Sequence, residues 1–364
     1  MNLKTEEIQK AAAYFTAGIE RLADGPLRIM EVCGTHTVAI FRAGIRQVLP
    51  DNVELVSGPG CPVCVTPNEY LDTAVAYSRR PDTVIATFGD MMKVPGTSST
   101  LLAEKAGGAD VRMVYSPLEA VQIAQDNPGK RVIFLAVGFE TTAPTAAAAV
   151  LAAVAAGVKN FFLLTAHKLV PPALTALLCL PETKVDGFLL PGHVCAITGI
   201  KPFEFLAAEF GVPSVIAGFE ALDILQGVYM LAKQIHTGQA QLKNQYRRIV
   251  PADGNPVARR VMEQVFTVSH ASWRGFGKIP DSGLNLNERF RHFDALHALP
   301  VEVTGSQESA GCRCGEVLRG KIKPPECPHF GRSCTPENPV GSCMVSVEGS
   351  CAAWFKYGAG RWQF

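Results

Sequence analysis

The sequence predicts an α/β fold with two similar parallel-sheet domains that face a cleft, followed by an irregular Cys-rich domain. Eight short apolar runs alternate with helical patterns between residues 27 and 220. Strand and helix alternation at this spacing is typical of parallel sheets covered by helices. After residue 270 long periodic patterns are absent, and six of the eleven cysteines lie between residues 312 and 351.

The order of these patterns predicts four units along the chain. The first, residues 1–26, is expected to be an N-terminal helix, because its pattern is charged and helical. A break at the "QDNPGKR" stretch then divides the strands between two consecutive α/β domains, residues 27–128 and residues 129–235. The remainder, residues 236–364, is expected to form a helical linker and the Cys-rich domain.

The composition excludes some classes of protein. A formal net charge of +1 gives no positive excess of the kind that binds nucleic acid. The apolar run at residues 146–158 is too short to span a bilayer, so no membrane insertion is expected. The N-terminus lacks the pattern of a secretory signal. We therefore expect a cytoplasmic protein, in which clustered thiols bind metal or do redox chemistry more often than they form structural disulfides.

Several polar residues follow the predicted strands directly, where parallel sheets bind ligands. Among them, Glu140 and Glu220 could orient ligands or carry protons. A carboxylate at the start of a helix is also stabilised by the helix dipole, so both could simply be structural.

The stretch "EVCGTHT" places Cys33 at the end of a strand and the start of a helix, with His36 three residues later. A thiol at a helix N-terminus is expected to have a lowered pKa. The pair could bind a metal, although Cys33 could also be a small buried residue and His36 a histidine at a helix start.

The stretch "SGPGCPVCVTP" holds Cys61 and Cys64 two residues apart in a proline-stiffened loop. Such a pair could be half of a zinc site, a cluster ligand pair or a redox-active dithiol. We interpret it as a redox pair.

The six C-terminal cysteines indicate a loop-rich domain stabilised by metal or by disulfides. They are Cys312, Cys314, Cys327, Cys334, Cys343 and Cys351. An iron–sulfur cluster tolerates irregular spacing, whereas structural zinc is often held by paired knuckles that are absent here. The pattern resembles ferredoxin–thioredoxin reductase, in which a disulfide lies beside a [4Fe-4S] cluster. That resemblance implies cluster ligands at Cys312, Cys327, Cys334 and Cys343. It implies an extra pair formed by Cys314 and Cys351.

Taken together, the motifs resemble the HypD family of hydrogenase maturation factors over roughly residues 28–355. The matching stretches are "CGTHT", "SGPGCPVCVTP", "FGDMMKVPG", "GFETTAP", "LLPGHV" and "AGFEALDIL", followed by the Cys-rich tail. The resemblance implies assembly of the Fe(CN)2CO unit of [NiFe]-hydrogenases. It implies that Cys33 binds the iron with His36 beside it, and that Cys61 and Cys64 are the redox-active dithiol.

The same resemblance implies a [4Fe-4S] cluster and several protein partners. These are a HypC-like chaperone bound about 1:1, a HypE-like cyanide donor and, through HypC, the hydrogenase large subunit. The dithiol and the cluster would supply electrons for cyanide attachment. The alternative function is a cluster-dependent thiol–disulfide oxidoreductase that acts on a protein substrate, which would require Cys61 and Cys64 to be exposed. Whether the chain itself counts as an enzyme stays open.

Overall fold

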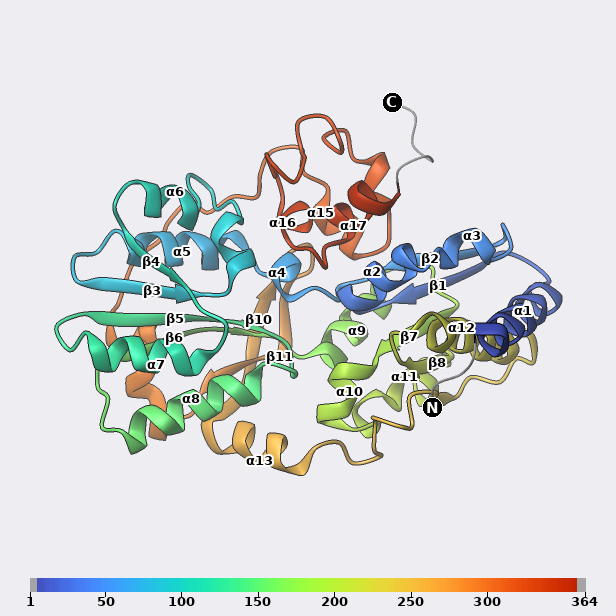
Figure 1. The fold of residues 1–364 in the computed structure, drawn as a ribbon, viewed down its shortest axis with the longest axis horizontal. Helices are drawn as coiled ribbons and strands as arrows, with labels where there is room; N and C mark the ends of the chain where they lie inside the picture. The colour runs from blue at the N-terminus through green and yellow to red at the C-terminus, as the bar shows by residue number, and fades with distance from the viewer. Residues whose placement is uncertain (1–4, 359–364) are drawn as a thin grey trace.

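The computed structural model describes residues 5–358 and has an α/β fold with two parallel sheets (Figure 1). Residues 1–4 and 359–364, the outer ends of the first and last predicted units, lie outside the described residues. The first sheet has the order β2-β1-β7-β8-β9 and the second β4-β3-β5-β6. The first comprises β1 (Leu27–Glu31), β2 (Val53–Ser57), β7 (Gly187–Pro191), β8 (Ser214–Ala217) and β9 (Leu242–Asn244). The second comprises β3 (Thr83–Thr87), β4 (Asp110–Met113), β5 (Arg131–Gly138) and β6 (Phe161–His167).

All eight predicted strands form, but they are not divided between the sheets as two consecutive halves. β3 and β4 belong with β5 and β6, across the boundary predicted at residues 128/129. β7 returns to pair with β1, so the first sheet draws strands from both predicted domains. A parallel pair needs only a crossover between its strands. That crossover can contain a whole second sheet, which the apolar runs do not reveal.

Helices cover the outer faces of both sheets. α1 and α12 pack on the first sheet through one apolar core, and α7 and α8 pack on the second through another. The helices of the first half are α1 (Thr5–Leu22), α2 (Gly34–Arg42), α3 (Ile45–Val48), α4 (Pro62–Val65), α5 (Asn68–Ser78), α6 (Leu101–Ala106), α7 (Pro117–Asp126) and α8 (Ala143–Ala155). The middle region adds α9 (Val170–Leu178), α10 (Gly192–Thr198), α11 (Phe205–Ala208), α12 (Ala221–His236) and α13 (Pro256–Val265). The C-terminal part has α14 (Ala295–Ala298), α15 (Cys314–Leu318), α16 (Ser342–Val345) and α17 (Ser350–Tyr357). Among residues 5–358, no helix is both long and apolar enough to cross a membrane.

The expected helical linker is partly wrong. After α13 the chain forms an antiparallel ribbon of β10 (Phe266–Trp273) and β11 (Gly277–Leu286). Alternate residues of β10 are exposed, and its polar side chains hide the strand from a search for apolar runs. In Figure 1 this ribbon lies between the two sheets.

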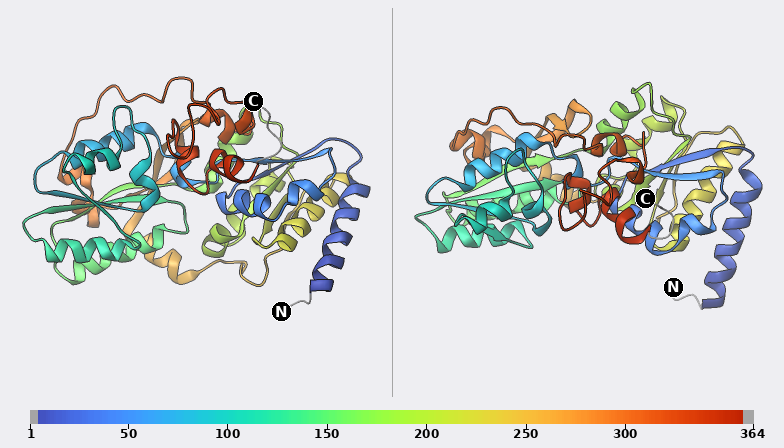
Figure 2. Two further views of the ribbon diagram at one scale, coloured as in Figure 1. Left: turned by 45° about the horizontal axis from the view of Figure 1, so that its top comes forward. Right: turned by 90° about the horizontal axis from the view of Figure 1, so that it is seen from above.

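The Cys-rich segment lies against both α/β units, at the top of Figure 1 and in front in the left view of Figure 2. Its α17 contacts α2, and its α16 contacts α4. Its cysteines Cys314 and Cys343 belong to the central apolar core that also contains Val32 and Leu135. The segment is therefore part of the main core.

Candidate thiol and iron site

Cys33 lies at the turn between β1 and α2, as the sequence predicts. It is the N-cap of α2 with an extended backbone. The predicted lowering of its pKa is wrong. Burial raises the pKa of the Cys33 thiol to about 12, the carboxylates of Glu348 and Glu31 raise it further, and the His36 backbone N–H opposes the rise. The desolvation of Cys33 raises its pKa by more than the helix N-terminus lowers it. The free thiol therefore stays protonated at neutral pH.

Glu31, the last residue of β1, holds this turn in place. Its buried carboxylate accepts the backbone N–H of Cys33 at 3.1 Å and the hydroxyl of Thr37. Burial raises the pKa of Glu31 to about 7, although both of these bonds lower it. The sequence analysis did not select Glu31. The available signal was an acidic residue at the end of an otherwise apolar strand that leads into Cys33.

His36 has a neutral ring with one free nitrogen. Its Nε2 donates to the carbonyl of Gly218 at 2.9 Å, so Nδ1 carries the lone pair. Nδ1 is buried and has no partner in the described part of the chain. Burial lowers the pKa of His36 to about 4, and the ring stacks on Phe219 at 4.5 Å between centroids. This histidine can act as a metal ligand without first losing a proton.

Cys61 and Cys64 form a disulfide on α4, close to the Cys33 turn. The N–H of Gly34 donates to the carbonyl of Gly60 at 2.9 Å. A Cβ at Gly60 would overlap the backbone of Val32 and Cys33, so only glycine permits this approach. Both cysteines are buried, at 4% and 0% exposure. The pair is thus packed against the Cys33 loop.

The second sheet contributes Glu140, which follows β5. It is 2% exposed, and its Oε1 accepts the N–H of Val170 at 2.9 Å. Its Oε2 has no partner among the described residues, and burial raises the pKa of Glu140 to about 7. Burial raises the pKa of the Cys195 thiol, on α10, and Glu140 and Cys33, when charged, are close enough to raise it further. The ends of strands from both sheets therefore converge near Cys195.

Glu220 does not join this group. It is the N-cap of α12, its side chain is 82% exposed, and its carboxylate lies 3.7 Å from Arg248. Its backbone N–H donates to Asp223. These contacts fit the structural alternative for Glu220, and its catalytic role stays a prediction.

The six C-terminal cysteines line one cavity between α15, α16 and α17. The predicted extra pair is wrong, because Cys314 forms a disulfide with Cys343, with 6.3 Å between their Cα atoms. Four thiols stay free in the cavity, at Cys312, Cys327, Cys334 and Cys351. Cys351 replaces Cys343 in the set because α16 points Cys343 toward Cys314, at the start of α15. Spacing along the chain does not encode this choice.

The four free thiols suit an iron–sulfur cluster. Burial raises the pKa of Cys351, and the charges of Cys334, Cys312 and Cys327 raise it further, so the four sulfurs are electrostatic neighbours. Such clusters are held by four cysteine thiolates. Within residues 5–358, no three side chains take the close arrangement of a single-ion site. A four-iron cluster is larger than an ion and needs more widely spaced ligands.

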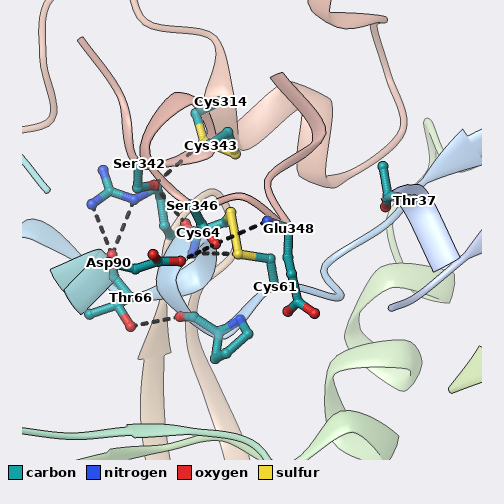
Figure 3. Close-up of a disulfide and its surroundings, with 12 residues drawn as sticks. Thr37, Cys61, Cys64, Thr66, Asp90, Cys314, Ser342, Cys343, Ser346 and Glu348 are labelled. Atoms are coloured by element: carbon teal, nitrogen blue, oxygen red, sulfur yellow. Dashed lines mark hydrogen bonds between the residues drawn. A yellow bond between two sulfur atoms is a disulfide. The ribbon is translucent and has the colours of Figure 1, made fainter. Parts of the chain in front are cut away.

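Ser342 lies between the two disulfides (Figure 3). Its hydroxyl donates to the carbonyl of Cys64 at 3.1 Å and lies 3.8 Å from the sulfur of Cys314. The two disulfides therefore lie on either side of Ser342, and the Cys61–Cys64 loop in turn packs on the Cys33 turn.

Glu348 connects the Cys-rich segment to the Cys33 turn. Its carboxylate accepts the hydroxyl of Thr35 at 2.7 Å. Gly34 packs so closely on Glu348 that a Cβ would overlap it. Glu348 was also missed from the sequence, because it belongs to an irregular loop with no periodic pattern.

Comparison with known proteins shows the family of the chain. A family model described as "Hydrogenase formation hypA family", named HypD, matches residues 9–358. The chain is 46% identical to the hydrogenase maturation factor HypD of Escherichia coli (strain K12), over 97% of this chain and 94% of that protein. It is 44% identical to HypD of Rhodobacter capsulatus, over 95% of each chain. It is 46% identical to the hydrogenase expression/formation protein HupD of Azotobacter chroococcum mcd 1, over 92% and 90%. The chain belongs to the HypD family of hydrogenase maturation factors.

Proposed function

We propose that this maturation factor is a scaffold that binds one iron while the iron acquires two cyanides and one carbon monoxide. Cys33 is the protein ligand, His36 lies beside it, and a HypC-like partner supplies a further ligand. The neutral, half-buried Cys33 thiol supports this role, because it becomes a thiolate when iron replaces its proton. A thiolate is a soft donor that suits iron carrying such ligands.

Cyanide attachment needs two electrons from the Cys61/Cys64 dithiol. The partner donor presents a thiocyanate, whose S–C bond breaks to give a thiol and cyanide. Two Cys61/Cys64 thiols are oxidised to the disulfide, which releases the two electrons and two protons. One of these protons protonates the donor's thiolate, the cyanide binds the iron as an anion, and the second proton is released to a base. Glu140 is the proposed carrier of that proton, since burial keeps its pKa at about 7.

The placement of the two disulfides on either side of Ser342 is the single observation that carries the proposal. Reduction of the resting Cys61–Cys64 disulfide requires a second dithiol within reach, and Cys314 and Cys343 lie on the far side of Ser342. Exchange reduces Cys61 and Cys64 while it oxidises Cys314 and Cys343, so electrons and protons balance. An external one-electron donor protein must then deliver two electrons in turn, and water two protons, to restore the Cys314/Cys343 dithiol.

Cys312, Cys327, Cys334 and Cys351 are the proposed holders of a [4Fe-4S] cluster, which supplies single electrons when it is bound. Their place beside the Cys314–Cys343 disulfide supports this assignment. We propose that this assembly takes place in the cytoplasm. Its partners are a HypC-like chaperone bound at about 1:1, a HypE-like cyanide donor and, through HypC, the hydrogenase large subunit.

The alternative thiol–disulfide oxidoreductase fits less well. That function needs a dithiol exposed to a protein substrate. Cys61 and Cys64 are 4% and 0% exposed and lie beneath the Cys-rich segment. Their burial favours a small donor group brought to an internal site.

Infrared spectroscopy of the chain purified anaerobically with its HypC-like partner tests the proposal. We expect bands from metal-bound carbon monoxide and cyanide that vanish in Cys33→Ala. Cys179→Ser, which replaces an exposed cysteine, should keep them. A wild-type complex that contains the cluster iron but lacks these bands would contradict the scaffold and favour the oxidoreductase.

A further inference from the structure

The tip of the β10–β11 ribbon lies between the two disulfide-bearing segments. Gly275, in this tip, packs backbone to backbone on Gly315, one residue after Cys314. A Cβ on either glycine would overlap the other, and Gly275 has a φ of +82° that glycine adopts freely. The ribbon tip is therefore fixed against the start of α15.

Arg274, the neighbouring residue in the same tip, holds the end of α4. Its backbone N–H donates to the carbonyl of Val65 at 2.8 Å. Its Nε and Nη2 both donate to the carbonyl of Thr66, at 3.1 and 2.8 Å. Nη2 also donates to Oδ1 of Asn68 at 2.7 Å. These acceptors follow directly after Cys64, so one side chain fixes the carbonyl end of the dithiol helix.

The guanidinium is also a buried charge near the cysteine cavity. Arg274 is 5% exposed, and its Nη1 pairs with Glu308, which is half exposed. Burial lowers the pKa of Arg274 to about 10, so it stays charged at neutral pH. The next residue, Gly275, packs on Gly315 beside Cys314, so the cation lies close to both redox elements.

We propose that Arg274 is a positioning residue that holds the Cys61–Cys64 helix against the Cys314–Cys343 disulfide, and that its fixed charge raises the reduction potential of the iron–sulfur group at Cys312. The proposal rests on the proposed function. Its two parts have separate causes. The position of the Cys61–Cys64 helix depends on the several N–H donors of the Arg274 guanidinium, which lysine cannot reproduce. The reduction potential of the iron–sulfur group depends on the charge, because a nearby cation stabilises a group that gains an electron. Lysine retains that charge.

The test compares the full chain, purified anaerobically, as wild type, Arg274→Lys, Arg274→Gln and Arg313→Gln. Arg313 is the matched control, because it also lines the cysteine cavity but is partly exposed and paired with Glu316, so water screens its charge. An electron paramagnetic resonance titration gives the potential of the cluster. We expect Arg274→Gln to reduce the reduced-to-oxidised ratio about tenfold at a fixed potential, which is about 59 mV for one electron. Arg274→Lys and Arg313→Gln should stay near wild type.

A second readout needs no iron. Dithiothreitol reduces the Cys61–Cys64 disulfide, and mass spectrometry follows maleimide labelling of the released thiols. We expect labelling to be about tenfold faster in both Arg274 variants and unchanged in Arg313→Gln. An unchanged potential in Arg274→Gln overturns the role of the charge, and unchanged labelling in both variants overturns the positioning role. Failure of the scaffold function appears separately, as missing infrared bands in the wild-type complex.

Discussion

At the scale of single residues, burial shifts the titratable groups of the site toward their neutral forms. Burial dominates the pKa of Cys33, Glu31, His36 and Glu140, and in each case it disfavours the charged form. A site of low dielectric strengthens the interaction between a bound iron and its ligands. The same burial makes the site depend on close backbone packing.

The packing at Gly60 gives the first prediction. Gly60→Ala places a methyl group against the backbone of Val32 and Cys33, so the two loops must move apart. Overpacking of this kind costs about 1–3 kcal/mol. Urea denaturation should show that loss of unfolding free energy. Gly25→Ala is the matched control, since a Cβ there meets no atom within 4 Å and should change stability by less than about 0.5 kcal/mol. Equal effects of both variants would contradict the packing argument.

The burial of Glu140 gives a pH prediction. Its pKa is about 7 in the fold against 4.5 for the ordinary group. Between these values the unfolded chain has lost the proton that the folded chain retains, so the wild type loses stability as pH rises from about 4.5 to 7. The shift corresponds to about 3 kcal/mol. Glu140→Gln cannot ionise, so urea denaturation at pH 5 and pH 8 should show that it gains on wild type by up to this amount. If the unfolding free energies of the two proteins changed equally between pH 5 and pH 8, the raised pKa of Glu140 would be ruled out.

At the scale of elements, an extended strap ties the Cys-rich segment to the second sheet unit. Residues 301–309 have no regular structure. Asp72 on α5 anchors them, because its carboxylate accepts the hydroxyl of Ser306 at 2.6 Å. It also accepts the N–H and hydroxyl of Thr97, at 2.7 and 2.6 Å, and Thr97 in turn accepts the N–H of Gln307. One side chain thus orders two loops.

Asp72→Ala should release this strap. Each lost hydrogen bond is worth about 1 kcal/mol, which corresponds to about fivefold in the population of the open form. A protease that cuts after glutamate should therefore cleave at Glu302 and Glu308 at least fivefold faster. Asp51→Ala, in an exposed turn, serves as the control. Unchanged cleavage in Asp72→Ala would mean that other contacts hold the strap.

At the scale of the whole molecule, local patterns were predictable and long-range partners were not. All eight apolar runs became strands, and the turn at Cys33 lies where the sequence placed it. The interleaving of the two sheets was not predictable, because the sequence of an apolar run such as β7 does not indicate which strand it pairs with. The ribbon of β10 and β11 escaped notice because its exposed face is polar. Convergence of Glu140 and Cys33 near Cys195 was only a general expectation from strand ends.

The division of the C-terminal cysteines is the long-range feature with the sharpest test. The fold pairs Cys314 with Cys343 and leaves Cys351 with the free thiols, whereas analogy from spacing had exchanged Cys343 and Cys351. Anaerobically purified Cys343→Ser should therefore retain the wild-type iron content, on the order of four irons per chain. Cys351→Ser should lose most of it.

Cys179→Ser controls for loss of a thiol elsewhere, because Cys179 is exposed and lies outside the cavity. Iron analysis and visible absorbance measure all three variants. The reverse result, with iron lost in Cys343→Ser and kept in Cys351→Ser, would restore the division inferred from spacing. In that case Cys343 would hold iron and could not form the disulfide with Cys314 that lies beside Ser342.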